Sequence, residues 1–324
     1  MTTCLSVLFL LLSMVAGADD VSAEQKPPVR VFLLAGQSNM VGAGQVKANP
    51  DRHDGMGSLE WLVDASPDKA RYAHLRNVNG TWVQRDDVKI WSLGRTGDLA
   101  PGFGANETRI GPELGFGSVV GEAYDEPVLL IKIAWGGKSI AQDFRPPSSG
   151  GEVGPNYRIL VDTTKEVLRD AGEHFPELDG RAVQLMGIGW HQGWNDRVNQ
   201  AFNDAYEENL SNFIRDVRHE LGLPRLPFVI AETGMSGHDE KHPRALSLMA
   251  AQAAVAEREE FEGNVGFVPT RGFYRSPERS PSGQQYHWNG NAETYYLIGE
   301  GMGRAMIDLC RTKEYPGAMP GPSR

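Results

Sequence analysis

The sequence predicts an α/β fold with a doubly wound, mainly parallel sheet, and two observations support this class. Near-continuous apolar runs are typical of strands buried on both faces of a parallel sheet. They occupy residues 29–35, 128–134 and 183–190, with shorter runs at 228–231 and 265–268. Helical patterns lie between these runs, and this alternation from residue 128 to residue 309 implies right-handed crossovers between parallel strands.

The helices are expected from the spacing of their apolar residues and from the residues at their ends. Residues 199–221 carry apolar side chains three to four positions apart, and Gly222 follows as a stop signal. Pro243 stands at the first turn of an alanine-rich helix expected over residues 243–261. Similar patterns predict helices over residues 112–123, 157–171 and 292–309.

One segment departs from this alternation. Residues 41–108 are rich in Gly, Asp and Asn. A structureless loop of that length is unusual in a compact domain, so we expect an excursion with structure of its own, including a short strand at residues 88–91. Residues 29–312 are expected to form one domain that includes this excursion.

The two ends of the chain are expected to lie outside this domain. Residues 1–18 look like a secretory signal peptide, in which a short apolar stretch is followed by Ala16-Gly17-Ala18, a fit to the small-residue cleavage rule. Cleavage near Ala18 implies export to the periplasm or the extracellular space. Residues 19–28 are expected to form a linker and residues 313–324 a flexible tail.

The composition excludes several classes of function. The 324 residues carry a formal net charge of −10, which argues against nucleic-acid binding because no basic surface would offset the repulsion of phosphates. No second long apolar run follows the signal, so no membrane span is expected in the mature chain. Cys4 leaves with the signal, and Cys310 alone forms neither an internal disulfide nor a cysteine-based zinc site. We expect no metal and no cofactor.

The strongest candidate for chemistry is Ser38, in the sequence Gly36-Gln37-Ser38-Asn39-Met40 directly after the first predicted strand. Gly36 allows a sharp turn at the end of that strand. Backbone N–H groups at the start of the next helix would then point toward a ligand. Ser38 is either a nucleophile or a simple helix cap. The Gly-x-Ser-x-Gly elbow of α/β-hydrolases is not met, because Met40 takes the place of its last glycine.

A serine nucleophile needs a base, and His287 is the candidate among eight histidines. It stands just before the last predicted helix, in a loop from which an imidazole can reach a cleft, and the alternative is a surface or capping histidine. Gly136 and Gly137 follow the second long apolar run, where glycines let backbone N–H groups approach a ligand closely. Gln192 follows the third run and carries an amide that can donate to an oxyanion.

The predicted positions of Ser38, Gly137 and Gln192 relative to one another indicate a shared site. Ser38, Gly137 and Gln192 all follow predicted parallel strands, and ligands of doubly wound sheets bind at the carboxyl ends of the strands. A nucleophile, two oxyanion donors and a histidine form a set suited to acyl transfer.

The set resembles the SGNH hydrolase superfamily, and more closely its sialate O-acetylesterase / acetylxylan esterase family (carbohydrate esterase family 6). The resemblance spans about residues 29–306 and is carried by Gly36-Gln37-Ser38-Asn39-Met40, Gly136-Gly137-Lys138-Ser139-Ile140, His191-Gln192-Gly193 and the block 287–299. It implies a three-layer, flavodoxin-like α/β/α sandwich and metal-free removal of acetyl esters from sugars. It also implies that Ser38 is the nucleophile and His287 the base. The implied oxyanion hole combines the N–H of Ser38, the N–H of Gly137 (or Gly136) and the side chain of Gln192.

The chain departs from the family pattern at two positions. The superfamily often has Asp three residues before its histidine, where this chain has Gln284, and relatives often have Glu after His-Gln-Gly, where it has Trp194. The group that orients His287 therefore stays open among Asp196, Glu232, Gln284 and a backbone carbonyl. Asp196 has the alternative role of capping the helix that follows it.

The expected partner is an acetylated oligosaccharide or polysaccharide. Trp135, Trp194 and Trp288 are candidates for stacking on sugar faces, and Asn39 is a candidate for hydrogen bonds to sugar hydroxyls. The net negative charge favours neutral, xylan-type glycans over sialylated ones. Two other functions stay open: an esterase or lipase of the same superfamily that acts on non-sugar esters, and a non-catalytic carbohydrate-binding protein that kept the fold.

Overall fold

The computed structural model describes residues 26–234 and 236–311. The predicted signal peptide at residues 1–18, most of the predicted linker and the predicted tail at residues 313–324 lie outside the described residues. None of the helices in the described part of the chain is long and apolar enough to cross a membrane.

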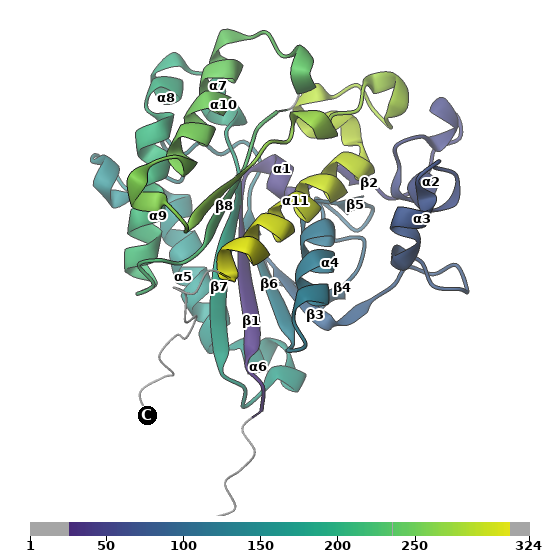
Figure 1. Cartoon of the computed structure of the whole chain (residues 1–324), viewed down its shortest axis with the longest axis horizontal. Helices are drawn as coiled ribbons and strands as arrows, with labels where there is room; N and C mark the ends of the chain where they lie inside the picture. The colour runs from purple at the N-terminus through teal and green to yellow at the C-terminus, as the bar shows by residue number, and fades with distance from the viewer. Residues whose placement is uncertain (1–25, 235, 312–324) are drawn as a thin grey trace, which may run out of the picture.

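A seven-stranded sheet forms the middle of the molecule, with helices on both of its faces (Figure 1). The strand order is β4-β3-β6-β1-β7-β8-β9, and neighbours are parallel except for the antiparallel pair of β3 and β4. The strands are β1 (Val29–Gly36), β3 (Arg85–Ser92), β4 (Arg95–Leu99), β6 (Val128–Ala134), β7 (Val183–His191), β8 (Phe228–Ala231) and β9 (Val265–Val268). A separate antiparallel pair joins β2 (Gly44–Gln45) to β5 (Arg109–Ile110). The predicted α/β class with a mainly parallel sheet is confirmed.

The helices follow the predicted pattern with two differences. They are α1 (Ser38–Val41), α2 (Leu59–Asp64), α3 (Lys69–Tyr72), α4 (Glu113–Ala123), α5 (Pro155–Arg169), α6 (Ala171–His174), α7 (Trp194–Arg197), α8 (Gln200–Asp204), α9 (Tyr206–Glu220), α10 (Pro243–Ala256) and α11 (Ala292–Cys310). The single helix predicted over residues 199–221 is divided at Ala205 into α8 and α9. The helix predicted over residues 243–261 ends at Ala256, and a 3₁₀ turn follows.

Each central strand contributes to two cores, which explains its continuous apolar sequence. Val31 and Leu33 of β1 pack in one core with side chains of α5, α9 and α10. Phe32 and Leu34 pack in the other core with side chains of α4 and α11. In Figure 1, α4 and α11 cross the sheet on the side that faces the viewer.

The predicted excursion at residues 41–108 contains regular structure, as expected from its length. It supplies α2 and α3 at the margin of the molecule (Figure 1) and the hairpin of β3 and β4. The strand predicted at residues 88–91 is the buried part of β3, which lies in the sheet between β6 and the edge strand β4.

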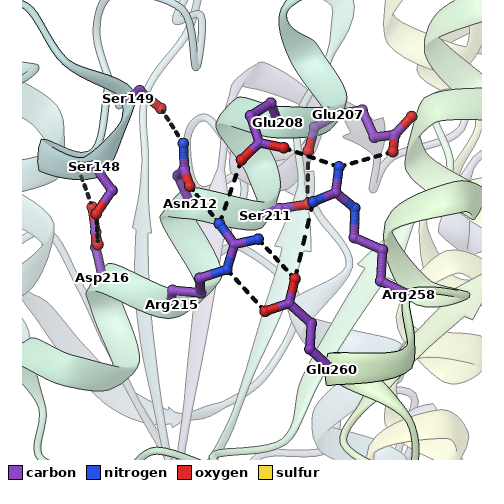
Figure 2. A network of polar contacts seen from close by, with 10 residues as sticks. All are labelled: Ser148, Ser149, Glu207, Glu208, Ser211, Asn212, Arg215, Asp216, Arg258 and Glu260. Atoms are coloured by element: carbon purple, nitrogen blue, oxygen red, sulfur yellow. Dashed lines mark hydrogen bonds and ion pairs between the residues drawn. The ribbon is translucent and has the colours of Figure 1, made fainter.

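A polar network ties the loop after β6 to helix α9 (Figure 2). The backbone N–H and the hydroxyl of Ser148 donate to the carboxylate of Asp216 at 2.8 and 2.6 Å, and the amide of Asn212 donates to Ser149 at 3.2 Å. On the same helix, Arg215 forms an ion pair with Glu260 at 2.7 Å. The network anchors the far part of the long loop whose first residues are Trp135, Gly136 and Gly137.

Candidate active site

Ser38 lies in a tight turn at the carboxyl end of the central strand β1. Gly36 ends this strand with φ of +154°, and a Cβ at this position would overlap the carbonyl oxygen of His191 at the end of β7. Only glycine therefore lets the ends of β1 and β7 approach this closely. Ser38 begins the single turn of α1 and is half-buried. Its backbone N–H has no acceptor within the described residues.

The side chain of Gln37 fixes the loop after β7 against this turn. Its Oε1 accepts hydrogen bonds from the backbone N–H of Gly193 at 3.0 Å and of Asn195 at 3.3 Å, and its Nε2 donates to Oδ1 of Asn195 at 3.3 Å. The Nδ2 group of Asn195 makes no hydrogen bond within the described residues and lies 3.9 Å from the position that a Cβ on Gly137 would take. A donor that the sequence analysis did not identify thus lies between the Ser38 turn and Gly137.

The two glycines after β6 complete this set of donors. The N–H of Trp135 binds the carbonyl of Gly36 at 3.3 Å, which brings the start of the loop next to the Ser38 turn. Gly136 and Gly137 are exposed, and their N–H groups have no acceptor within the described part of the chain. Gly137 has φ of +68°, a conformation that favours glycine. Unsatisfied N–H groups in a turn next to a serine are suited to bind an oxyanion.

Gln192 and Asp196 link the loops after β6 and β7. The carboxylate of Asp196 accepts hydrogen bonds from the backbone N–H groups of Ile140 and Ala141, both at 2.9 Å, and from Nε2 of Gln192 at 2.5 Å. Nε2 of Gln192 also donates to the carbonyl of Lys138 at 2.9 Å. Both N–H groups of the Gln192 amide are thus used inside the loops. Burial raises the pKa of Asp196 to about 6.

His287 lies on a strained turn before α11. The two residues that follow it, Trp288 and Asn289, have φ of +49° and +55°, which non-glycine residues seldom adopt. His287 is half-buried, its ring centroid lies 4.6 Å from that of Tyr286, and burial lowers the pKa of its imidazole. The imidazole has no hydrogen-bond partner within the described residues.

Asn39 connects the His287 turn to the Ser38 turn. Its Nδ2 donates to the carbonyl of Tyr286 at 3.1 Å, and its Oδ1 accepts from the hydroxyl of Tyr295 at 2.7 Å. The same tyrosine hydroxyl lies 3.3 Å from the carbonyl of His287. The residue after Ser38 is therefore bonded directly to the residue before His287. Asn39 is buried, and its side chain is occupied by these contacts.

The three residues considered for orienting His287 make other contacts. Asp196 holds the loop after β6, as described above. Glu232 is buried and accepts the backbone N–H groups of Thr270 at 2.9 Å and Arg271 at 3.3 Å. Gln284 is exposed, and it is its backbone carbonyl that accepts the backbone N–H of His287 at 2.8 Å. In this structure none of the three side chains meets the imidazole.

The tryptophans considered for sugar binding lie in different environments. Trp194 is half-buried, with its ring 6.0 Å from that of Tyr286 and the guanidinium of Arg197 3.7 Å from its centroid. Trp135 is half-buried against Phe144. Trp288 is 0% exposed and stacks on the buried ring of His191, so it has no surface to offer a substrate. Trp194, Trp135 and the exposed ring of Tyr286 remain near the site.

The buried Lys132 is a further residue that the sequence analysis did not identify. Its ammonium donates to the carbonyl of Val41 in α1 at 2.7 Å, to the carbonyl of Phe103 at 2.8 Å and to Glu113 at 2.6 Å. It is the one charged residue in the apolar run of β6, and that position is the signal that could have identified it. No group of three or more His, Cys, Asp or Glu side chains among the described residues is arranged to hold a metal ion.

Comparison with known proteins gives consistent matches. Residues 28–308 match the family model described as carbohydrate esterase, sialic acid-specific acetylesterase. The chain is 26% identical over 223 residues to the probable carbohydrate esterase At4g34215 of Arabidopsis thaliana, which covers 66% of this chain and 73% of that protein. The solved structure of the same Arabidopsis thaliana protein has a TM-score of 0.58 at 18% identity and covers 87% of this chain and 98% of its own.

Two further solved structures share the fold. The structure of NanS has a TM-score of 0.55 at 15% identity and covers 89% of this chain and 99% of its own. A carbohydrate acetylesterase from Xanthomonas citri, XAC1771, has a TM-score of 0.54 at 14% identity and covers 86% of this chain and 56% of its own. The matched family region contains the turns of both Ser38 and His287, and the resemblance found in the sequence is confirmed. The chain belongs to the sialic acid-specific acetylesterase family of carbohydrate esterases.

Proposed function

We propose that this chain is a secreted carbohydrate O-acetylesterase in which Ser38 and His287 remove acetyl groups from sugars through an acetyl-enzyme. Family membership supports the hydrolysis of acetyl esters. The hydrogen bond from Asn39 to the carbonyl of Tyr286 carries the assignment of the two residues, because it joins the immediate neighbours of Ser38 and His287.

In the first half-reaction, Oγ of Ser38 attacks the acetyl carbonyl carbon while the neutral imidazole of His287 takes the hydroxyl proton. The tetrahedral oxyanion accepts hydrogen bonds from the N–H groups of Ser38 and Gly137 and from Nδ2 of Asn195. The bond between the carbonyl carbon and the sugar oxygen then breaks, and the sugar leaves with the proton from His287. In the second half-reaction, water repeats the attack on the acetyl-enzyme, which releases acetate and restores the Ser38 hydroxyl.

Gln192 and Asp196, two other predicted site residues, hold the loops of the site in place. Gln192 and Asp196 keep the loop with Gly136 and Gly137 against the loop after β7, so that the N–H donors keep their positions. We propose that Ser38 and His287 act as a dyad, since the imidazole meets none of the three candidate side chains. In the serine-protease triad the carboxylate is worth about 10⁴-fold in kcat, so a slow turnover is expected here.

The sugar is expected to lie against the aromatic wall of Trp194 and Tyr286. The Arg197 guanidinium covers one face of Trp194, and Tyr286 is 43% exposed beside His287. Aromatic rings offer a flat apolar surface to a pyranose ring. The overall charge of −10 favours neutral acetylated glycans of the xylan type.

The test is acetate release by the wild type and by Ser38→Ala, on a small aryl acetate and on acetylated xylan. The proposal expects release by the wild type and its loss in Ser38→Ala, with unchanged circular dichroism. Ser247→Ala, an exposed serine on α10, is the matched control and keeps full activity. Equal release by wild type and Ser38→Ala would show that Ser38 is not the nucleophile. No release by the wild type would favour a non-catalytic carbohydrate-binding protein.

Export is tested separately from catalysis. Residues 1–18 support it through their signal-like sequence. When the full chain is expressed in its own type of host, the exported protein should begin directly after a cleavage site near Ala18. An intact N-terminus on protein that stays inside the cell would contradict this part of the proposal.

A further inference from the structure

A cavity of about 610 Å³ lies beside the turn that carries Ser38, at the carboxyl ends of β3 and β6. Its wall includes Val41, the last residue of α1, and Ala134, which pairs with Gly36 in the sheet. The cavity therefore borders the end of the Ser38 turn. Its volume falls within the range of about 300–1,000 Å³ that is typical of ligand sites.

The rest of the lining combines apolar surface with hydrogen-bonding groups. The apolar surface comes from Leu93, Phe103 and Ala105, and the hydroxyl and amide groups come from Ser92, Asn106 and Thr108. The hydroxyl of Ser92 makes no hydrogen bond within the described residues, and Asn106 uses its Oδ1 but not its Nδ2. A pyranose ring presents the matching combination of apolar faces and hydroxyl groups.

The charges at this cavity favour a neutral ligand. The ammonium of Lys132 is occupied by Glu113 and two backbone carbonyls. The guanidinium of Arg95 donates to the carbonyls of Gly102 and Gly104 at 3.0 and 2.8 Å. The exposed carboxylate of Glu107 balances the charge of Arg95, and Glu113 balances that of Lys132, so the wall carries no net charge that would attract an acidic sugar.

Leu93 occupies an unfavourable position that folding alone does not explain. It forms the two-residue turn between β3 and β4 with Gly94, and both residues have positive φ, +46° and +87°. Asn-Gly is the preferred sequence for such a turn, and a leucine is strained there. The Leu93 side chain is also 46% exposed. A strained, exposed apolar residue at the wall of a cavity points to ligand binding.

We propose that this cavity is a subsite for the sugar residue next to the acetylated one in a neutral oligosaccharide or polysaccharide. The inference rests on the proposed esterase function and adds that the enzyme selects acetylated chains over acetylated monosaccharides. The acetylated residue reacts at Ser38, and its neighbour in the chain lies between Leu93, Phe103 and the polar groups of Ser92 and Asn106.

The test compares kcat/KM for an acetylated methyl xyloside and an acetylated xylotriose in the wild type and three variants. Leu93→Asn removes the leucine from the apolar wall and creates the preferred Asn-Gly turn, so it is expected to raise the melting temperature. Ala105→Trp fills the cavity from an exposed position. Val78→Asn is the matched control, because Val78 is an exposed apolar residue in another turn, outside the cavity.

The wild type is expected to prefer the trisaccharide by about tenfold or more, the order of magnitude that one added pocket contact supplies. In Leu93→Asn and Ala105→Trp this preference should fall toward one, and in Val78→Asn it should persist. Because the readout is a ratio of two substrates, a general loss of catalysis does not mimic the result. Equal kcat/KM for both substrates in the wild type would overturn the subsite, as would faster hydrolysis of an O-acetylated sialoside than of the trisaccharide.

Calorimetry with unacetylated xylotriose separates the subsite from the esterase function. The wild type is expected to bind xylotriose more tightly than xylose, and Leu93→Asn should lose this difference. Binding that depends on Leu93 in a protein without activity on any acetate ester would overturn the proposed function and support the subsite. Hydrolysis of aryl acetate with no Leu93-dependent binding would overturn the subsite alone.

Discussion

The ammonium of Lys132 lies 2.6 Å from Oε2 of Glu113, and both side chains are buried from solvent. Glu113 also accepts the backbone N–H of Gly111 at 2.7 Å, and Lys132 binds the carbonyls of Val41 and Phe103. One ion pair therefore joins β6, the start of α4, the end of the Ser38 turn and the wall of the neighbouring cavity.

Lys132→Met should destabilise the protein strongly. It leaves the carboxylate of Glu113 buried without its counter-ion, a change that typically costs about 3–5 kcal/mol. Urea denaturation at neutral pH measures the loss. Lys165→Met is the control, because Lys165 pairs with Glu220 on the surface, where about 0–1 kcal/mol is expected. A loss of less than about 3 kcal/mol for Lys132→Met would show that the buried pair does not hold these segments together.

The acidic limb of the pH–activity profile should lie below pH 6.5. Burial lowers the pKa of His287 from its usual 6.5, and in the proposed mechanism the imidazole must be neutral to accept the Ser38 proton. Activity therefore rises with pH through the lowered pKa and is already near its plateau at pH 7. The profile of kcat/KM on an aryl acetate reports this pKa in the free enzyme. A limb above pH 7 would instead indicate a carboxylate that stabilises the imidazolium.

Asp196 should make stability depend on pH between about 4 and 6. Its pKa is raised from 3.8 to about 6 by burial, so the folded protein holds this proton more tightly than the unfolded chain does. The stabilisation is complete below pH 3.8 and is lost as the pH rises through 6. The free energy of unfolding should fall by about 3 kcal/mol at most over this range. Urea unfolding of the wild type and Asp196→Asn at pH 4, 5, 6 and 7 measures it. A free-energy difference between the two proteins that is constant with pH would contradict the raised pKa.

Asn195→Ala should lower kcat and leave KM nearly unchanged. Removal of one oxyanion donor costs about 10²–10³-fold in kcat, because the donor acts mainly on the transition state. Steady-state kinetics on an aryl acetate separate the two constants. Asn199→Ala is a matched control a few residues away, where the side chain caps α8 and affects helix stability only. If KM rose while kcat stayed constant, Asn195 would be a binding residue.

Several features of the site were predictable because they depend on local sequence. Gly36 and Ser38 follow a strand whose apolar residues specify burial on both faces, and the sharp turn requires glycine. Gly136, Gly137 and Gln192 follow such strands as well. Parallel strands of one sheet bring their carboxyl ends to a common edge, so these residues were expected to meet.

Other features depended on contacts between distant segments. Asp196 was weighed as a helix cap or a partner of His287, and its carboxylate lies instead against the N–H groups of Ile140 and Ala141. Asn195 and Gln37 are 158 residues apart in the chain, so no local pattern could indicate their contact. From the sequence, Trp288 was expected to be available to a sugar in a polar loop. The left-handed turn after His287 instead directs its side chain into the core.

The amino-acid sequence by itself determined the α/β class, the order of most strands and helices, and the membership of Ser38 and His287 in one family pattern. These follow from hydrophobic periodicity and from glycines at strand ends, which act over a few residues. Only the tertiary structure decided which groups lie together: Asn195 beside Gly137, the occupied carboxylates of Asp196 and Glu232, and the cavity beside Leu93. Side-chain contacts depend on how separate loops pack at one edge of the sheet, and the spacing of residues along a single chain does not record that packing.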